Sequence, residues 1–161
     1  MDARVLLIDD EPDFTKSVTD AFYDRGVNVE HAATWEDGEQ LFRVGMHDLV
    51  IADFDLAGAR DGLLLLAKLK DLRPGARLLL ISGKSVTIPA ETIESSKVVD
   101  RFLVKDVKLM TELLDEAAAS EKRAKQSSDW RKLAERHVAA SDVDKDHVEE
   151  IDALMRSALE N

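Results

Sequence analysis

The sequence contains no cysteine, only three prolines and seven glycines, and a single tyrosine. Without thiols, disulfide cross-links and thiolate metal sites are excluded, and this composition is typical of proteins in a reducing compartment. The four histidines are scattered along the chain without the spacing of metal ligands, so we expect them at the surface or at sheet edges. Any metal site in this chain would therefore use oxygen ligands.

Long apolar runs are also missing from the sequence. A membrane-spanning helix needs about 20 consecutive apolar residues. The first apolar run, Val5–Ile8, is far shorter and has acidic residues after it, so it predicts neither a signal peptide nor a membrane span. We therefore expect a cytoplasmic protein that does not associate with membranes.

Positive charge is scarce: 22 Lys and Arg face 33 Asp and Glu, which gives a net charge of −11. The acidic excess is spread over the first 105 residues and the last 56 alike. Proteins that bind the phosphate backbone of nucleic acids carry a basic patch or stripe. Direct DNA binding is therefore not expected.

Four apolar runs each end in a polar residue at a comparable point. They are Val5–Ile8 followed by Asp9 and Asp10, Leu49–Ala52 followed by Asp53, Leu78–Ile81 followed by Ser82, and Arg101–Val104 followed by Lys105. Short apolar runs bounded by turn-like or helical stretches are typical of buried parallel strands. Because functional sites of open α/β sheets lie at the carboxyl ends of the strands, these polar residues are the candidate site.

Amphipathic segments alternate with the apolar runs. Helices are predicted over 13–24, from the cap Thr34 to near Gly45, and over 62–72, with a further strand over 27–32. The crossover 85–97 is rich in β-branched residues and contains Pro89, so we expect a short or irregular helix there. The alternation predicts an α/β fold with a five-stranded parallel sheet covered by helices on both faces.

The chain exceeds a typical single domain of roughly 100–150 residues, so we predict a domain over 1–120 and a helical extension over 121–161. An apolar stripe from Val107 to Ala117 can cover the sheet as its last helix. Two further stripes, beginning at Trp130 and at Val148, predict two short amphipathic helices in the extension. Such helices must pack on each other, on the domain or on a second chain, which makes a homodimer one expectation.

The polar residues at the strand ends suggest a specific chemistry. If Asp9, Asp10 and Asp53 converge, their mutual repulsion calls for a cation, and a hard divalent ion such as Mg²⁺ suits carboxylate oxygens. Asp53 could then act as a nucleophile toward a phosphoryl group. Lys105 could pair with phosphate oxygens, and the hydroxyl of Ser82 could donate a hydrogen bond to one of them.

These residues together resemble the receiver domain of bacterial two-component response regulators, over roughly residues 1–120. The resemblance is carried by Asp9-Asp10-Glu11, Asp53, Ser82-Gly83 and Phe102-Leu103-Val104-Lys105. It implies a flavodoxin-like fold, Mg²⁺ held by Asp9, Asp10, Asp53 and the backbone carbonyl of Asp55, and phosphorylation of Asp53. It also implies that Ser82 and Phe102 move on phosphorylation, as switch residues.

The partners implied by the resemblance are a histidine kinase or histidine phosphotransfer protein upstream and a downstream protein that reads the switch. Such a protein is not an enzyme in the ordinary sense, since it catalyses only its own phosphorylation and dephosphorylation. Two departures from the family pattern are Ala57, where proline is usual, and Asp106, which follows Lys105 in place of a cis-proline. We expect an altered loop after Asp53, a trans bond before Asp106, and Asp106 as a cap of the last helix.

Other interpretations of the same residues stay open at this point. Asp53 taken alone could be a simple helix cap, and Phe102 could be an ordinary core residue. The whole chain could be a receiver-like scaffold or dimerisation module that acts without phosphorylation, through its helical extension. A small phosphatase-type hydrolase with Asp53 as nucleophile and Asp55 as general acid is a third possibility, although no substrate-binding insertion is visible in the sequence.

Overall fold

The computed structural model describes residues 3–56, 62–83, 97–141, 153 and 156–157 of the chain. The altered loop predicted after Asp53 and nearly all of the irregular helix predicted over 85–97 lie outside the described residues. The elements in chain order are β1 (Val5–Ile8), α1 (Pro12–Tyr23), β2 (Val29–Ala32), α2 (Trp35–Val44), β3 (Leu49–Asp53), α3 (Gly62–Leu72), β4 (Arg77–Ser82), β5 (Arg101–Val104) and α5 (Leu109–Ser141).

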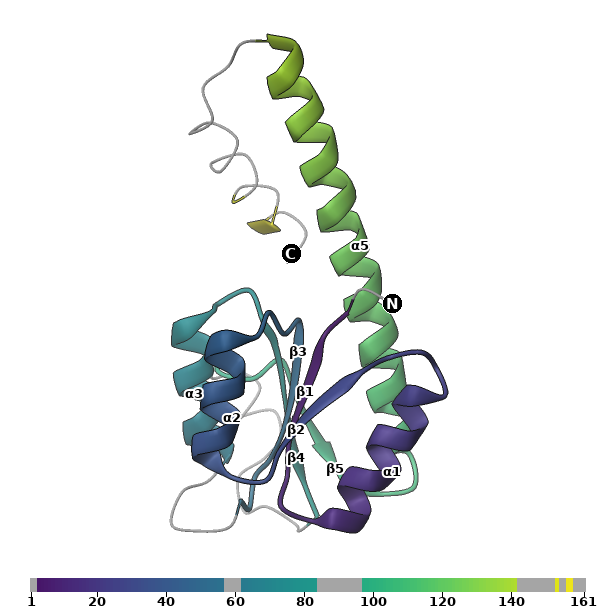
Figure 1. The fold of residues 1–161 in the computed structure, drawn as a ribbon. Coiled ribbons are helices and arrows are strands. Elements are labelled where there is room, and N and C mark those ends of the chain that lie inside the picture. Colours follow the sequence, from purple (N-terminus) through teal and green to yellow (C-terminus); the bar gives the residue numbers. More distant parts are fainter. Residues whose placement is uncertain (1–2, 57–61, 84–96, 142–152, 154–155, 158–161) are drawn as a thin grey trace. The chain divides into compact units, whose positions relative to one another are not determined.

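The five strands form one parallel sheet in the order β2-β1-β3-β4-β5, and Figure 1 labels each of them. This is the doubly wound, flavodoxin-like arrangement, and it confirms the predicted fold class. Because every pair of neighbours is parallel, the carboxyl ends of all strands lie at the same edge. That edge is the lower one in Figure 1, where β1 leads into α1.

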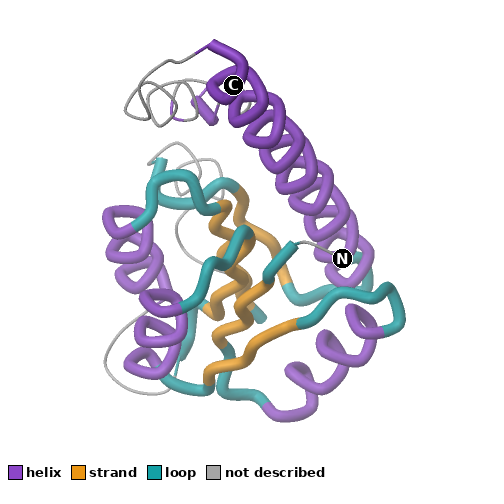
Figure 2. Tube along the Cα trace, turned by 45° about the horizontal axis from the view of Figure 1, so that its top comes forward, coloured by secondary structure: helices purple, strands orange, loops and turns teal. Residues whose placement is uncertain are grey.

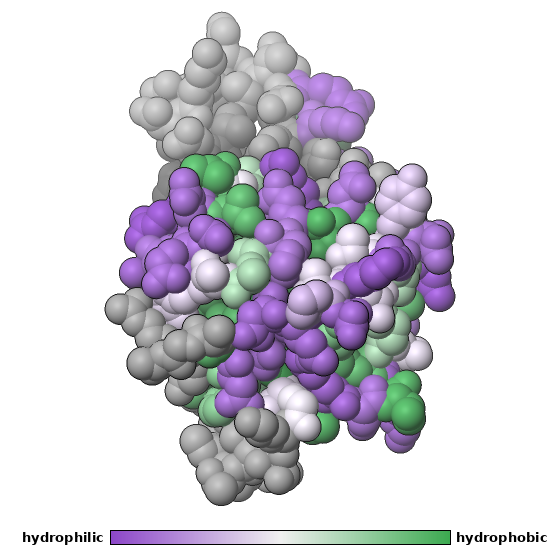
Figure 3. All heavy atoms as spheres, turned by 60° about the horizontal axis from the view of Figure 1, so that its bottom comes forward, coloured by the Kyte–Doolittle hydropathy of each residue, from purple (hydrophilic) through white to green (hydrophobic). Residues whose placement is uncertain are grey.

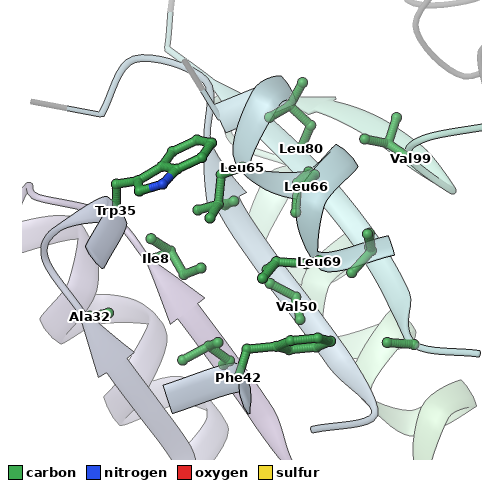
Figure 4. Close-up of a cluster of buried hydrophobic side chains, with 14 of the residues drawn as sticks. Ile8, Ala32, Trp35, Phe42, Val50, Leu65, Leu66, Leu69, Leu80 and Val99 are labelled. Atoms are coloured by element: carbon green, nitrogen blue, oxygen red, sulfur yellow. The ribbon is translucent and has the colours of Figure 1, made fainter. Parts of the chain in front are cut away.

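Helices α2 and α3 cover one face of the sheet. Figure 4 shows the core beneath them, where Leu65, Leu66 and Leu69 of α3 and Phe42 of α2 meet apolar side chains of the strands. The strand residues on this face alternate along the chain, as Leu6 and Ile8 do in β1, because successive side chains of a strand point to opposite faces. These side chains are fully buried.

The opposite face of the sheet is covered by α1 and by the first three turns of α5. Val18 and Phe22 of α1 and Leu113 of α5 are completely buried against the other alternate set of strand residues, which includes Leu7 and Ile51. Figure 2 shows helices on both sides of the strands. Since the three inner strands β1, β3 and β4 are buried on both faces of the sheet, they consist mostly of apolar residues, which explains the uninterrupted runs in the sequence.

Local signals in the sequence set several helix ends. The hydroxyl of Thr34 accepts a hydrogen bond from the Asp37 amide and caps α2, as predicted. Gly26 follows α1 with a positive φ of 73°, a conformation that glycine adopts at little cost.

The second strand, β2, is shorter than predicted, because it begins at Val29 instead of Val27. No cis peptide occurs among the described residues, so the bond before Asp106 is trans.

The prediction of surface or edge positions for all histidines is wrong for His47, whose side chain is buried before β3. Its ring is stacked on Phe42, with centroids 6.3 Å apart, and its Nε2 pairs with the carboxylate of Glu30 on β2. The guanidinium of Arg73 lies 4.4 Å from the centre of the Phe42 ring and donates to the carbonyl of Gly45 at 2.8 Å. These contacts fix the end of α2, at the edge of the sheet opposite the candidate site.

Helix α5 continues without interruption to Ser141. The stripe that begins at Trp130, predicted to form a separate short helix, belongs to this continuous helix. The stripe that begins at Val148 falls almost wholly outside the described residues. The contacts within the chain divide it into two compact units, one over 3–120 and one from Glu121 onward. No described helix combines the length and the apolar character needed to cross a bilayer.

Candidate functional site

Three aspartates meet at the carboxyl edge of the sheet. Asp9 and Asp10 follow β1, and Asp53 is the last residue of β3, the strand next to β1 in the sheet. The register pairs Ile8 with Ala52, so the residues that come directly after these two, Asp9 and Asp53, lie at the same level. Carboxylate oxygens of Asp9, Asp10 and Asp53 lie within 4.8 Å of one another.

The three carboxylates differ in their access to water. Asp9 is completely buried, Asp53 is nearly so, and Asp10 is exposed. Burial raises the pKa of Asp9, because it disfavours the charged form, while hydrogen bonds from Lys105 and from the Glu11 amide act in the opposite direction. The site therefore has a buried floor, formed by Asp9 and Asp53, and one acidic group at its rim.

Lys105 lies in the middle of this acidic group. Its Nζ donates to Asp9 Oδ2 at 2.8 Å, to Asp53 Oδ2 at 3.2 Å and to Glu11 Oε2 at 3.3 Å. Burial on its own lowers the pKa of Lys105, but the neighbouring carboxylates of Asp9 and Asp53 outweigh that effect and the pKa is raised above its usual 10.5. The lysine is thus held as a cation against two buried carboxylates.

The backbone supplies the remaining hydrogen bonds of the two buried aspartates. The Glu11 amide donates to Asp9 Oδ1 at 2.8 Å, and the Asp55 amide donates to Asp53 Oδ1 at 3.1 Å. Each of these carboxylates therefore has one oxygen on a backbone N–H and the other on the lysine. This arrangement compensates their burial with hydrogen bonds at every oxygen.

Ser82 and Phe102 lie where the sequence predicted them, on the two neighbouring strands. Ser82 is buried at the end of β4, and its carbonyl oxygen accepts a bond from the Lys105 amide at 2.8 Å. Phe102 lies beside Leu80 in the β4–β5 register and is half-buried against the core under α2 and α3. The Asp106 carboxylate accepts a bond from the Lys108 amide, which forms a turn just ahead of α5. Because Lys108 precedes the helix, this bond does not confirm the predicted role of Asp106 as its cap.

Sequence reasoning missed three residues that shape the site. The ring of Phe14 on α1 lies beneath the Lys105 ammonium, with its centre 4.2 Å from Nζ. His31 on β2 donates from Nε2 to the carbonyl oxygen of Asp9 at 2.8 Å. Neither contact has a signal in the sequence, because Phe14 reads as part of an apolar stripe and His31 as one residue of an edge strand.

The third missed residue is Gly62, which the sequence marks only as the first residue of a predicted helix. A Cβ atom at this position would lie 2.1 Å from the carbonyl oxygen of Asp53, far inside any real contact distance. The Gly62 amide also donates to the carbonyl of Phe54 at 2.9 Å. The start of α3 therefore packs directly on the backbone of the acidic site, and only glycine fits there.

The donor set of this site suits one class of ligand. Three carboxylates within reach of one another, without nitrogen or sulfur ligands among the described residues, match the oxygen preference of Mg²⁺ or a similar hard divalent ion. Figure 3 shows the molecule turned so that the lower edge of Figure 1 comes forward, and hydrophilic side chains cover much of the centre of this face. A charged ligand could approach such a surface from solvent.

A family model described as the response regulator receiver domain matches residues 5–118. Among curated proteins, the transcriptional regulatory protein DltR of Streptococcus agalactiae is 27% identical over 84 residues, which make up 52% of this chain and 37% of that protein. The chain thus covers little more than a third of that relative's length.

Solved structures share the fold at low sequence identity. A CheY-like receiver domain protein from Methanospirillum hungatei is 24% identical, with a TM-score of 0.64 over 74% of this chain and 97% of that one. The signal receiver domain of a putative Luxo repressor protein from Vibrio parahaemolyticus is 21% identical and has a TM-score of 0.68; the match covers 80% of this chain and 96% of that one. A response regulator from Burkholderia pseudomallei is 23% identical and has a TM-score of 0.64; the match covers 96% of this chain and 98% of that one.

Proposed function

Because this chain belongs to the response regulator receiver domain family, a family of signalling switches, we propose that it accepts a phosphoryl group on Asp53 and signals through contacts with other proteins. The observation that carries the proposal is the convergence of Asp9, Asp10 and Asp53 within 4.8 Å, with the Lys105 ammonium bound to two of them. Phosphoryl transfer depends mainly on positioning and charge stabilisation, and this arrangement offers both.

Asp53 is the acceptor in this proposal because its carboxylate is almost completely buried and lies close to the other two aspartates and to the Lys105 ammonium. Its Oδ2 faces the Lys105 ammonium, while its Oδ1 accepts from the Asp55 amide. A carboxylate oxygen of Asp53 attacks the phosphorus of the donor, and the bond between that phosphorus and its leaving group breaks. Lys105 then pairs with a phosphoryl oxygen, as a compact cation on a flexible stem can.

Asp9, Asp10 and Asp53 are the residues that would hold Mg²⁺, with the backbone carbonyl of Asp55 as a further ligand. The three carboxylates supply the oxygen atoms that this ion prefers, and few carboxylates suffice because Mg²⁺ retains several waters. When bound there, the ion supplies charge neutralisation for the incoming phosphoryl group. The Burkholderia response regulator of the same fold has a phosphorylated aspartic acid and a calcium ion, which is consistent with such a site.

The proposed phosphodonor is a histidine kinase or a histidine phosphotransfer protein, and the output is a change of surface that a downstream protein recognises. Ser82 and Phe102 are proposed to transmit the change, since Ser82 ends β4 and its carbonyl accepts a bond from the Lys105 amide, and Phe102 lies on β5, the strand that Lys105 follows. The helical extension from Glu121 onward is proposed as a docking or dimerisation element. We place the protein in the cytoplasm, where such kinases act on their partners.

The test is the intact mass of the protein after incubation with a small phosphodonor and Mg²⁺, for the native chain and for Asp53→Asn. We expect one phosphoryl adduct on the native chain and none on the variant. A titration with Mg²⁺ alone, followed by calorimetry, measures cation binding separately.

Each outcome distinguishes between functions. Mg²⁺ binding without an adduct from a small donor, and without one from a panel of histidine kinases, would favour a scaffold that acts without phosphorylation. Turnover of a generic phosphate ester that depends on Asp53 would instead favour a hydrolase. An adduct on Asp53→Asn would place the acceptor at another residue.

A further inference from the structure

One side chain outside the acidic group contacts its backbone directly. His31, on the edge strand β2, has its Nε2 atom 2.8 Å from the carbonyl oxygen of Asp9 and 3.3 Å from the hydroxyl oxygen of Thr15. A carbonyl oxygen only accepts hydrogen bonds, so Nε2 must carry the hydrogen and donate it. The Thr15 hydroxyl oxygen is near enough to share the same N–H. One imidazole therefore joins β2, the loop after β1 and the first turns of α1.

The position of this contact follows from how the pairing of β1 with β2 ends. The last paired residues are Ile8 and Ala32, and the Asp9 amide adds one more bond, to the Ala32 carbonyl at 3.0 Å. After Ala32 the chain turns away toward α2, which Thr34 caps, so β2 has no backbone amide left for the Asp9 carbonyl. The His31 side chain supplies that missing donor. Strand β2 thus holds Asp9 by two hydrogen bonds. The Ala32 carbonyl accepts from the Asp9 amide, and the His31 imidazole donates to the Asp9 carbonyl.

The carbonyl of Asp9 belongs to the peptide group that joins Asp9 to Asp10. The orientation of this peptide group sets the direction of the backbone at Asp10. We propose that His31 is a positioning residue for the acidic site: its bond to the Asp9 carbonyl fixes this peptide and holds the Asp10 carboxylate where it can bind a divalent cation. The inference rests on the proposed function, in which Asp10 is a ligand of Mg²⁺. Asp10 is the exposed member of the acidic group and directly follows the peptide that His31 holds.

Three substitutions at His31 separate the hydrogen bond from the shape of the side chain. In His31→Gln the amide nitrogen is as many bonds from Cβ as Nε2 is, so the donor is retained. In His31→Asn the amide nitrogen matches the position of Nδ1 and stops short of the Asp9 carbonyl. His31→Leu has a similar size and no donor. Because His31 is exposed on an edge strand, all three variants are expected to fold.

The measurement is the Mg²⁺ dissociation constant of the full chain and its variants, by calorimetry. We expect His31→Asn and His31→Leu to bind Mg²⁺ about tenfold more weakly than the native protein, which is the lower end of the loss seen when groups that orient metal ligands are removed. The Mg²⁺ affinity of His31→Gln should stay within about twofold of the native value. The ¹³C chemical shift of the Asp9 carbonyl in metal-free protein reports the bond itself. It should move in the Asn and Leu variants and stay near the native value in the Gln variant.

A second histidine provides the control. His47→Gln disturbs a buried ring at the opposite edge of the sheet, so it should lower the unfolding temperature without changing Mg²⁺ affinity. Native affinity in His31→Leu, or equal losses in the Gln and Leu variants, would overturn the positioning role while leaving the proposed function intact. Failure of the native chain itself to bind Mg²⁺ would overturn both.

Discussion

The Lys105 ammonium lies over the face of the Phe14 ring, 4.2 Å from its centre, while it donates to the carboxylates of Asp9 and Asp53. The negative face of an aromatic ring attracts a cation, so Phe14 and the carboxylates confine the lysine from different sides. Phe14 belongs to α1, whereas Lys105 follows β5. The relationship therefore connects the first helix to the residue proposed to pair with the phosphoryl group.

Replacing Phe14 with leucine should slow phosphoryl acceptance. Leucine retains apolar packing against the core under α1 and α5 but loses the π face. A partly exposed cation–π contact contributes about 0.5–1 kcal/mol, so we expect a roughly two- to fivefold lower rate of adduct formation. The rate is measured by intact mass against time with a small phosphodonor. Phe14→Tyr, which keeps the ring, should behave as native, and a Leu variant as fast as native would show that the contact has no role.

A methyl group at Gly62 should damage the site and the fold together. The added Cβ would meet the Asp53 carbonyl at 2.1 Å, so the start of α3 or the end of β3 must shift. We expect a loss of roughly 1–3 kcal/mol in the free energy of unfolding, as for other overpacked sites, together with weaker Mg²⁺ binding. Urea denaturation and calorimetry measure the two effects.

Gly83→Ala is the matched control for that substitution. Its added Cβ would lie 3.7 Å from the Lys105 side chain, an ordinary contact distance. Stability and Mg²⁺ affinity should therefore change little. Equal effects at Gly62 and Gly83 would contradict the steric explanation.

Replacing Glu116 with glutamine should reduce stability at neutral pH but not in acid. Glu116 is buried on α5 and accepts from Arg77 Nε at 2.6 Å and from Arg101 at 3.2 Å. Burial acts to raise the pKa of Glu116, but these arginines outweigh it and the pKa falls below 4.5. A lowered pKa means that the ionised form stabilises the fold above pH 4.5, and that this stabilisation is lost as the pH falls through the folded-state pKa.

We therefore expect Glu116→Gln to lose roughly 1.5–3 kcal/mol of unfolding free energy at pH 7, the range for hydrogen bonds to charged groups. The difference from the native protein should close as the pH drops below 4.5. Denaturant unfolding at a series of pH values measures it. Glu112→Gln, at a half-exposed position 3.4 Å from Arg101, should cost less than about 1 kcal/mol. A pH-independent difference for Glu116→Gln would contradict the ionic explanation.

A chain that ends at Ser120 should keep the receiver fold and its phosphoryl acceptance. Where the structure describes the burial of α5 residues, the buried ones are Leu109, Leu113, Glu116, Ala117 and Ser120, and all of them lie within this shorter chain. Cooperative unfolding and an Asp53-dependent adduct on the short chain are the expected results. An unfolded short chain would show instead that the extension is part of the domain.

The proposed dimer can be tested on the same pair of chains. Molecular mass against concentration should rise for the full chain only, if the helices from Glu121 onward associate. Identical mass curves for both chains would remove the extension as a dimerisation element.

The strands and the acidic site were predictable because each depends on a short stretch of sequence. A strand buried on both faces must be apolar along its whole length, and the polar residue after it marks the edge of the sheet. Asp9, Asp10, Asp53 and Lys105 were brought together by this argument and a parallel order alone. The start of α2 followed from the cap Thr34 in the same local way, and the predicted end of α3 at Leu72 lies directly before Arg73-Pro74-Gly75, a sequence that does not continue a helix.

What could not be predicted depends on contacts between distant segments. The ring of Phe14 meets Lys105 across 91 positions of the chain, and His31 reaches Asp9 across 22. The burial of His47 depends on Phe42 and on a partner carboxylate in β2. Gly62 looks like any turn glycine until the backbone of β3 is placed beside it. The continuity of α5 was missed because residues 119–129 lack strong apolar periodicity, although no glycine or proline interrupts this part of the chain.

The lysine among the three aspartates also sets a charge balance. With all groups ionised, the three aspartates and the Lys105 ammonium sum to −2, leaving aside Glu11, whose exposed carboxylate lies at the rim of the site, 3.3 Å from the same ammonium. A divalent cation would bring this sum to zero, whereas a monovalent ion would leave a negative remainder and a trivalent ion a positive one. Removing Lys105 would take the sum to −3 and break this match. Lys105 thus lowers the negative charge of the three aspartates to a value that one divalent cation neutralises, before the size or coordination number of the ion is considered.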